Sequence, residues 1–291
     1  MYPELLRLGP FVISSYGFML VVAFATAYIM LTRDGKRIGW PPELAQDIVF
    51  WSAIGGILGS KIYYLIENIG RGAGDNLAGL WDMIAGLFTL SPQRIAEGIQ
   101  NFGAGLVFLG GLVGGMLAVT LLLRRKKISW LSTADVLAPY LILGYAIGRC
   151  GCFLVGDDFG IPTHLPWGVS FENGLPPTTY HSFQTHYPWI DLTGFEPGLL
   201  TVHPTQIYEV ILGLGIFGFL YWYRSKARFA GQVFSLYLIL AGTERFFIEF
   251  IRTNRHYFLG MTGAQIIAII MIVIGGYLLY WLPRRHKVDT S

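Results

Sequence analysis

Long apolar runs dominate this chain and constrain its fold more than any other feature. A helix needs about 20 apolar residues to cross the hydrocarbon core of a bilayer. Runs of about this length occupy 12–32, 45–66, 103–123, 134–155, 205–223, 231–251 and 263–282. Only 13% of the residues are charged, whereas a soluble domain carries roughly 25%. The sequence therefore predicts an all-α polytopic membrane protein, a single membrane domain over 1–291 with seven transmembrane helices.

Basic residues follow every second run and predict the orientation, because short cytoplasmic loops collect Lys and Arg. The clusters are Arg33, Lys36 and Arg37; Arg124, Arg125, Lys126 and Lys127; Arg224, Lys226 and Arg228; and Arg284, Arg285 and Lys287. The stretch 151–223 contains neither Lys nor Arg. We expect the N-terminus outside the cell and the C-terminus in the cytoplasm. The net charge of +3 sums these anchors and indicates no nucleic-acid partner.

Two segments on the predicted outer side are too long to be simple turns. Segment 67–101 contains an apolar patch, LAGLWDMIAGLFTL, that is short for a span and predicts an interfacial helix forming an extracytoplasmic arm. Segment 157–203 is rich in Pro, Thr, Tyr and His. Its composition predicts short strands and turns in a small extracytoplasmic head region.

Charged residues inside two of the runs predict a polar site. Arg149 lies near the outer end of the fourth run, in GRCGCFLVGDDFG, and is either a snorkelling anchor or part of a site. In the sixth run, Arg245, Glu249 and Arg252 are spaced i, i+4 and i+7, which predicts one helical face. Arg149 and Arg245 would lie at similar depth, where two guanidiniums suit a bidentate clamp. A lipid phosphate is the ligand that such a clamp favours.

Other polar residues leave more than one interpretation open. Tyr16 could add its phenolic hydroxyl to the site or belong to the aromatic belt. His203 opens the segment HPTQIYE, where a capping role and a site role are equally open, and Glu209 is expected to be a structural partner. Cys150 and Cys152 are too few for a metal cage and are expected to pack as small apolar residues. We expect no metal and no cofactor.

Five motifs together resemble one known family. They are GRCGCFLVGDDFG, YG at Tyr16, GGLVGG at Gly110, HPTQIYE at His203 and RFFIEFIR at Arg245. In order and spacing, over nearly the whole chain, they are similar to the bacterial prolipoprotein diacylglyceryl transferases. The resemblance implies a seven-helix body with an arm and a head in the bacterial plasma (inner) membrane. It also implies transfer of the diacylglyceryl group of phosphatidylglycerol to the lipobox cysteine thiol of exported prolipoproteins, with release of glycerol phosphate.

The resemblance also assigns residues. It implies importance for Tyr16, Arg149, Gly160, Arg245 and Glu249. With the spacing argument, we expect Arg149, Arg245 and Glu249 to be catalytic, and the substrate-binding residues to be Tyr16, Arg149, Gly160, Arg245, Arg252 and His203. Two places depart from the family pattern. Leu109 stands where the family has His, and in the signature Cys152, Val155 and Asp157 replace Asn, Asn and Glu.

The departures leave the acceptor of the thiol proton open, because a leucine accepts no proton. The candidates are Glu249, Asp157, Asp158 and His203, or a thiol that ionises unaided near the arginines. The alternative hypothesis is a divergent protein of the same fold that binds phospholipid or modifies a different acceptor. A transporter or channel is disfavoured, because the charges gather near one side and no pair of interrupted helices occupies matching halves.

Overall fold

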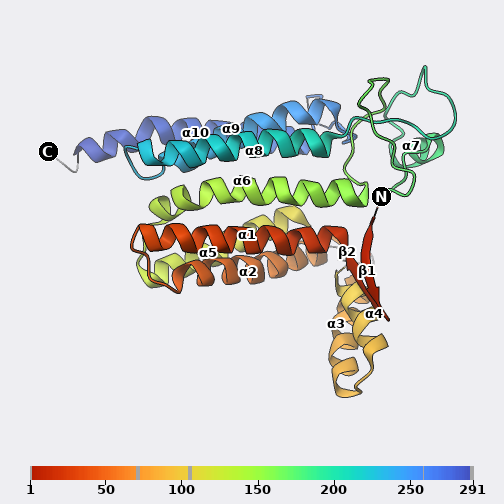
Figure 1. Cartoon of the computed structure of the whole chain (residues 1–291), viewed down its shortest axis with the longest axis horizontal. Coiled ribbons are helices and arrows are strands. Elements are labelled where there is room, and N and C mark those ends of the chain that lie inside the picture. The colour runs from red at the N-terminus through yellow and green to blue at the C-terminus, as the bar shows by residue number, and fades with distance from the viewer. Residues whose placement is uncertain (1, 70–72, 104–106, 258, 289–291) are drawn as a thin grey trace. The chain divides into compact units, whose positions relative to one another are not determined.

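The computed structural model describes residues 2–69, 73–103, 107–257 and 259–288. Most of these residues are helical (Figure 1). The elements are β1 (Glu4–Leu8), β2 (Phe11–Ser14), α1 (Ser15–Arg37), α2 (Leu44–Glu67), α3 (Ala73–Phe88), α4 (Pro92–Gly103), α5 (Phe108–Lys126), α6 (Trp130–Val155), α7 (Tyr180–His186), α8 (Thr205–Tyr223), η1 (Arg224–Lys226), α9 (Gln232–Ile248), η2 (Glu249–Ile251) and α10 (Gly263–Val288). Each of the seven predicted runs coincides with a helix, although residues 104–106 of the third run lie outside the described residues.

Five helices in the described part of the chain are long and apolar enough to cross a membrane. They span Ser15–Arg37, Leu44–Glu67, Trp130–Val155, Thr205–Lys226 and Gly263–Arg284. The helices α5 and α9, on the other two predicted runs, have 19 and 17 residues. The prediction of a mostly helical, multi-pass membrane protein is thus confirmed.

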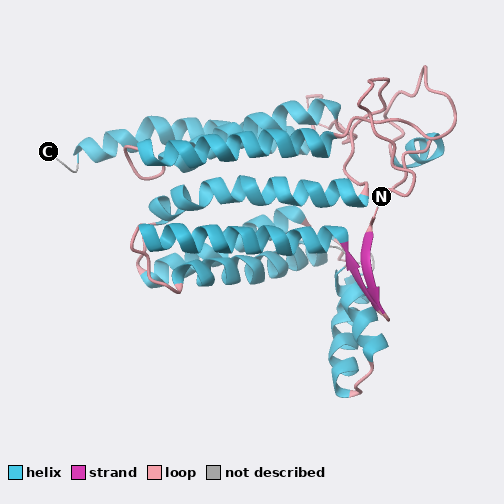
Figure 2. Cartoon of the chain, viewed as in Figure 1, coloured by secondary structure: helices cyan, strands magenta, loops and turns pink. Residues whose placement is uncertain are grey.

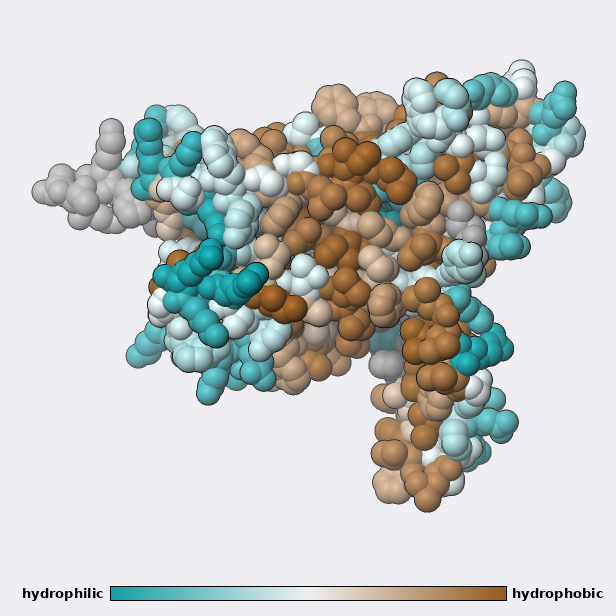
Figure 3. All heavy atoms as spheres, viewed as in Figure 1, coloured by the Kyte–Doolittle hydropathy of each residue, from teal (hydrophilic) through white to brown (hydrophobic). Residues whose placement is uncertain are grey.

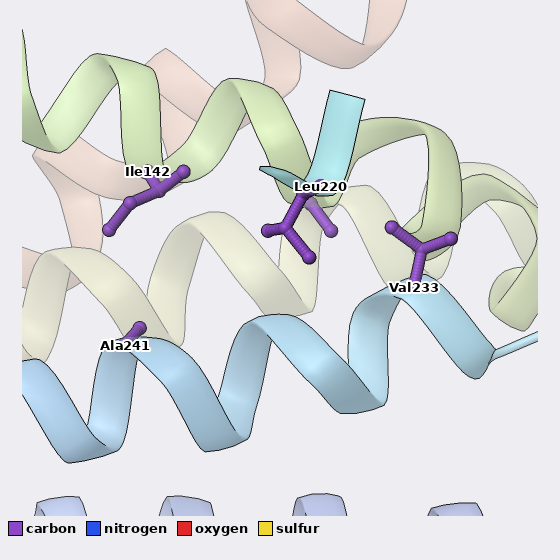
Figure 4. Packing of buried hydrophobic residues seen from close by; sticks show 5 residues of the cluster. Ile142, Leu220, Val233 and Ala241 are labelled. Atoms are coloured by element: carbon purple, nitrogen blue, oxygen red, sulfur yellow. The ribbon is translucent and has the colours of Figure 1, made fainter. Parts of the chain in front are cut away.

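The chain forms two compact units. Unit 1 comprises Met1–Leu5, Ser14–Leu31 and Leu131–Ser291, and unit 2 comprises Leu6–Ile13 and Thr32–Trp130. In unit 1, buried apolar side chains from α6, α8 and α9 form a core, which includes Ile142, Leu220, Val233 and Ala241 (Figure 4). This core packs the three helices against one another, and the charged residues of α8 and α9 described below lie at the helix ends that are farther from Leu220 and Val233.

The segment between α6 and α8 consists mainly of loops around the short helix α7 (Figure 2). Its core contains Phe159, Phe171 and Phe183 with Leu200 and Val202, all buried. The expected short strands are single antiparallel bridges, for example Val169 with Val202. The physical reason is that the aromatic core, together with α7, leaves little extended backbone to pair.

In unit 2, α2 and α5 pack closely through glycines. A Cβ atom added to Gly114 would lie 2.2 Å from the carbonyl oxygen of Gly55, closer than any side chain tolerates. The helix expected at the apolar patch of the arm is α3, and it pairs through Gly86 and Gly98 with a second helix, α4, that was not predicted. Apolar residues gather on this pair (Figure 3), and Phe88 is 82% exposed.

The first strands, β1 and β2, form a two-stranded sheet that the apolar pattern did not predict. Helix α1 accordingly begins at Ser15, three residues after the expected start at 12. The Ser15 hydroxyl donates a hydrogen bond to the carbonyl oxygen of Tyr2, and this bond ties the start of α1 to the residues before β1.

Candidate active site

Six charged side chains meet where α6 ends, α8 begins and α9 ends, all within unit 1. They are Arg149, Asp158, Glu209, Arg245, Glu249 and Arg252, which we call the ion-pair cluster. Three arginines balance three carboxylates in this cluster. Charged groups at a helix-dense, apolar position are expensive unless they are paired, and each member has at least one partner.

Glu209 lies at the centre of the cluster and is fully buried. Its Oε2 is 3.1 Å from Nε of Arg149, and its Oε1 is 3.0 Å from Nη1 of Arg245 and 3.4 Å from Nη1 of Arg252. The hydroxyl of Tyr145 donates a further hydrogen bond of 2.8 Å to Oε1. One carboxylate therefore gathers three guanidiniums, so the structural partner role expected for this residue is a central one.

Glu249 forms the expected ion pair with Arg245, at 2.9 Å between Oε2 and Nη2. The expectation that Arg252 extends the same helical face was wrong. Helix α9 ends at Ile248, η2 follows, and Arg252 adopts an extended conformation with φ of −87° and ψ of 162°. Its Nε still lies 3.8 Å from Oε2 of Glu249, so the two arginines flank the carboxylate from different elements.

The backbone of Arg252 pairs with the segment around Gly160, a pairing that we call the seam at Gly160, and this pairing holds Arg252 outside the helix. Gly160 pairs with Arg252 in an antiparallel bridge, and the N–H of Gly160 donates to the carbonyl oxygen of His203 at 2.9 Å. A Cβ atom added to Gly160 would lie 2.5 Å from the carbonyl oxygen of Ile251 and 2.8 Å from Cβ of His203. The predicted importance of Gly160 thus has a packing reason, because three chain segments meet at its α-carbon.

Asp158 joins two of the arginines on the accessible side of the cluster. Its Oδ2 is 2.6 Å from Nη1 of Arg149, and its Oδ1 is 2.7 Å from Nη2 of Arg252. Burial raises the pKa of Asp158, but the charges of Arg252 and Arg149 outweigh that effect and lower the pKa to about 2. This carboxylate is therefore a poor proton acceptor near neutral pH.

Asp157, the neighbouring residue, has a raised pKa, whereas the pKa of Asp158 is lowered. Burial and the negative charge of Asp158 raise the pKa of Asp157 to about 6. Its Oδ1 is buried without a hydrogen-bond partner, while Gln206 donates to its backbone carbonyl oxygen at 2.6 Å. Of the open candidates for the proton acceptor, this carboxyl group has a pKa close to the range that general base catalysis requires.

His203 lies beside the cluster but outside it. Its Nδ1 is 3.5 Å from the hydroxyl of Tyr208, which accepts a hydrogen bond of 2.7 Å from the indole of Trp167. Burial lowers the pKa of His203 below its ordinary value, which favours the neutral imidazole. Its backbone belongs to the seam at Gly160, and its ring faces the aromatic residues.

Tyr16 is the second residue of α1 and packs against α6. The two helices approach closely, since a Cβ atom added to Gly151 of α6 would lie 3.3 Å from Cα of Tyr16. The side chain of Tyr16 is 45% exposed.

Cys152, expected to pack as a small apolar residue, is buried, and Nη1 of Arg149 lies 3.8 Å from its sulfur. Both cysteines are free thiols.

Sequence reasoning found four members of the ion-pair cluster as site residues and underestimated two. Asp158 was considered only as a base, and Glu209 only as a partner. A usable signal existed for Glu209, since a glutamate in the second turn of an apolar helix requires compensation. Tyr145, which lies one helical turn before Arg149, gave no such signal, because a tyrosine on a membrane helix is ordinary.

Two further sequence expectations concern Leu109 and metal binding. Leu109 is the second residue of α5 and belongs to unit 2. No group of three or more His, Cys, Asp or Glu side chains that could hold a metal ion occurs in the described ranges. The chemistry available in unit 1 is that of paired arginines and carboxylates, which suits an anionic ligand.

Comparison with known proteins identifies the family. Residues 3–281 match the family described as prolipoprotein diacylglyceryl transferase. The phosphatidylglycerol–prolipoprotein diacylglyceryl transferase of Clostridium tetani is 32% identical over 276 residues, which cover 94% of this chain and 95% of the relative. Proteins of the same name from Coxiella burnetii and Bordetella bronchiseptica are 31% and 30% identical, covering 98% and 97% of this chain and 96% and 95% of the relatives. The chain therefore belongs to the prolipoprotein diacylglyceryl transferase family, a family of transferases.

Proposed function

We propose that this chain transfers the diacylglyceryl group of phosphatidylglycerol to the thiol of a lipobox cysteine in exported prolipoproteins. The reaction forms a thioether and releases glycerol phosphate. The observation that carries the proposal is the gathering of three arginines around Glu209 at the ends of α6, α8 and α9. The family match along nearly the whole chain gives this anion-binding chemistry its substrate.

The cysteine sulfur attacks the glycerol carbon, and the bond from that carbon to the phosphate oxygen breaks. Negative charge then grows on the departing phosphate, and Arg149 and Arg245 stabilise it. Their side chains are 12% and 23% exposed, so a ligand reaches them while most water is excluded. Glu249 acts through Arg245 by holding its guanidinium in place, which makes it a positioning residue.

The other substrate-binding residues surround these arginines. Arg252 adds a third positive charge, and Gly160 holds the backbone from which it extends. Tyr16 offers an exposed phenol beside α6, and His203 borders the seam. We expect these groups to orient the lipid headgroup, since the reaction requires the carbon, the thiol and the phosphate oxygen to align.

We further propose that Asp157 accepts the thiol proton. The pKa of about 6 makes Asp157 largely ionised at pH 7 and still basic enough to receive a proton. Asp158, with a pKa of about 2, is a weaker acceptor. Glu249 is already engaged by two arginines, and the ring of His203 is directed to the hydroxyl of Tyr208. After the transfer, the protonated Asp157 returns its proton to solvent or to the released glycerol phosphate.

In the membrane, we propose that α1, α2, α5, α6, α8, α9 and α10 are the seven spans. The N-terminus then lies outside and the C-terminus in the cytoplasm, as the alternating basic clusters favour. Segments 67–101 and 157–203 form the extracytoplasmic arm and head. Exposed apolar side chains on the arm, including Trp81 and Phe88, favour contact with the bilayer interface. The location is the bacterial plasma membrane, where phosphatidylglycerol and exported prolipoproteins meet.

The direct test supplies purified protein with labelled phosphatidylglycerol and a lipobox peptide. We expect a thioether-linked diacylglyceryl peptide by mass spectrometry, and no product from the peptide in which the cysteine is serine. Phospholipid that stays bound without product would contradict the transferase proposal and favour the lipid-binding alternative. In that case, transfer by the Leu109→His variant would indicate that the leucine at this position accounts for the missing activity.

A further inference from the structure

Asp158 differs from the other carboxylates of the ion-pair cluster in its accessibility. Its side chain is 46% exposed, whereas those of Glu209 and Glu249 are fully buried. Its two oxygens each contact a different guanidinium, at 2.6 Å to Arg149 and 2.7 Å to Arg252. This two-oxygen bridge is the arrangement that a phosphate group also makes with a pair of arginines.

The side chain of Asp158 can leave while its backbone stays. The hydroxyl of Thr205 donates a hydrogen bond of 2.9 Å to the carbonyl oxygen of Asp158, which fixes the main chain to the start of α8. The residue has φ of +58°, in the left-handed region that costs most side chains energy and that Asp and Asn tolerate best. Rotation about the side-chain bonds alone therefore removes the carboxylate from the arginines.

The charge balance of the cluster requires such a departure. Its three arginines are already matched by Asp158, Glu209 and Glu249, and Asp157 adds a further carboxyl group beside Asp158. A phosphate that entered beside all three carboxylates would bring surplus negative charge into a partly buried site, which is costly. A phosphodiester carries one negative charge, so its exchange with the exposed carboxylate leaves the net charge of the site unchanged. With a pKa near 2, Asp158 stays ionised and competes at any physiological pH.

We propose that in the free protein the carboxylate of Asp158 occupies the part of the phosphate site between Arg149 and Arg252, and that an arriving phosphate displaces it. Arg245, which shares Glu209 with Arg252, completes the other side of that site. Asp158 thereby sets the affinity of the site for phosphate-bearing ligands. The inference rests on the proposed function in so far as the phosphate belongs to a phospholipid. A soluble phosphate ester has the same chemistry and is distinguished by the experiment below.

The test compares Asp158→Asn with the wild type in a neutral detergent. Asparagine keeps the size and accepts the left-handed backbone but removes the competing charge. Dissociation constants are measured for glycerol 1-phosphate by calorimetry, and for phosphatidylglycerol and diacylglycerol by intrinsic fluorescence. We expect both phosphate ligands to bind about three- to tenfold more tightly, the range for removing one or two half-exposed ion pairs. Binding of diacylglycerol, which has no phosphate, should not change.

Asp191→Asn is the matched control, because Asp191 is exposed and its carboxylate bonds only to Thr193 among the contacts seen. It should bind all three ligands as the wild type does. Weaker or unchanged phosphate binding by Asp158→Asn would overturn the inference, since Asp158 would then position the arginines or lie apart from the phosphate. Tighter binding of glycerol 1-phosphate alone would contradict displacement by the lipid. Tighter binding of both ligands without peptide modification by the wild type would overturn the proposed function and support the displacement.

Discussion

Replacing Glu209 with glutamine tests whether a buried carboxylate holds the site together. The substitution preserves shape, and the amide oxygen can still accept the hydrogen bond from Tyr145. It removes the negative charge that contacts Arg149, Arg245 and Arg252 at 3.1, 3.0 and 3.4 Å. Three guanidiniums then face two carboxylates, and one positive charge is left without compensation.

The magnitude follows from the burial of the pair. Removing one partner of a buried ion pair costs about 3–5 kcal/mol. Arg149 and Arg245 retain 12% and 23% exposure, so water compensates part of the loss, which favours the lower end of that range. A loss of about 3 kcal/mol lowers the melting temperature by roughly 6–12 °C in a unit of this size. Transferase activity should fall as well, because the arginines lose their common anchor.

The assay is thermal unfolding of the detergent-solubilised protein, followed by fluorescence. Glu172→Gln is the matched control, because Glu172 is exposed in the loop between α6 and α7 and should leave the melting temperature unchanged. A melting temperature of Glu209→Gln within about 2 °C of that control would show that the charge of Glu209 does not hold the three arginines together.

Three further substitutions test the remaining parts of the site. Arg245→Lys keeps the charge but loses the planar fork, so transfer should fall roughly tenfold to a hundredfold, and unchanged activity would reduce the residue to an anchor. Gly160→Ala places a Cβ atom 2.5 Å from the carbonyl oxygen of Ile251, and should cost about 1–3 kcal/mol in thermal unfolding. Gly144→Ala, in open space on α6, should not destabilise the protein. For the proton acceptor, kcat/KM of the wild type should rise with pH to a plateau above pH 6, and Asp157→Asn should lose this limb; a flat wild-type profile would contradict the assignment.

The helices were predictable because the bilayer imposes a length and an apolar composition that are visible in any single run. The seven runs coincide with α1, α2, α5, α6, α8, α9 and α10. The short strands β1 and β2 were missed, since five residues of mixed polarity carry little periodic signal. The second arm helix was missed for a related reason, because α4 is polar on one side and lacks a continuous apolar run.

In the site, the sequence predicted well what depends on neighbouring residues along one helix. The pair of Arg245 and Glu249, one turn apart, forms as expected. Arg252 did not follow, because its backbone pairs with Gly160, a residue distant in the sequence. The periodicity of α9 contains no information about that bridge.

The apolar runs, the positions of the charged residues and the five motifs were enough to predict a membrane protein, a polar site near the ends of a few helices, and the family. They did not predict that Glu209 contacts three arginines or that Asp158 bridges two of them. These contacts join residues from the ends of different helices, so they depend on how those ends pack and not on local spacing. The stretch GRCGCFLVGDDFG supplies Arg149 and Asp158, but their partners Glu209 and Arg252 come from α8 and from the segment after η2.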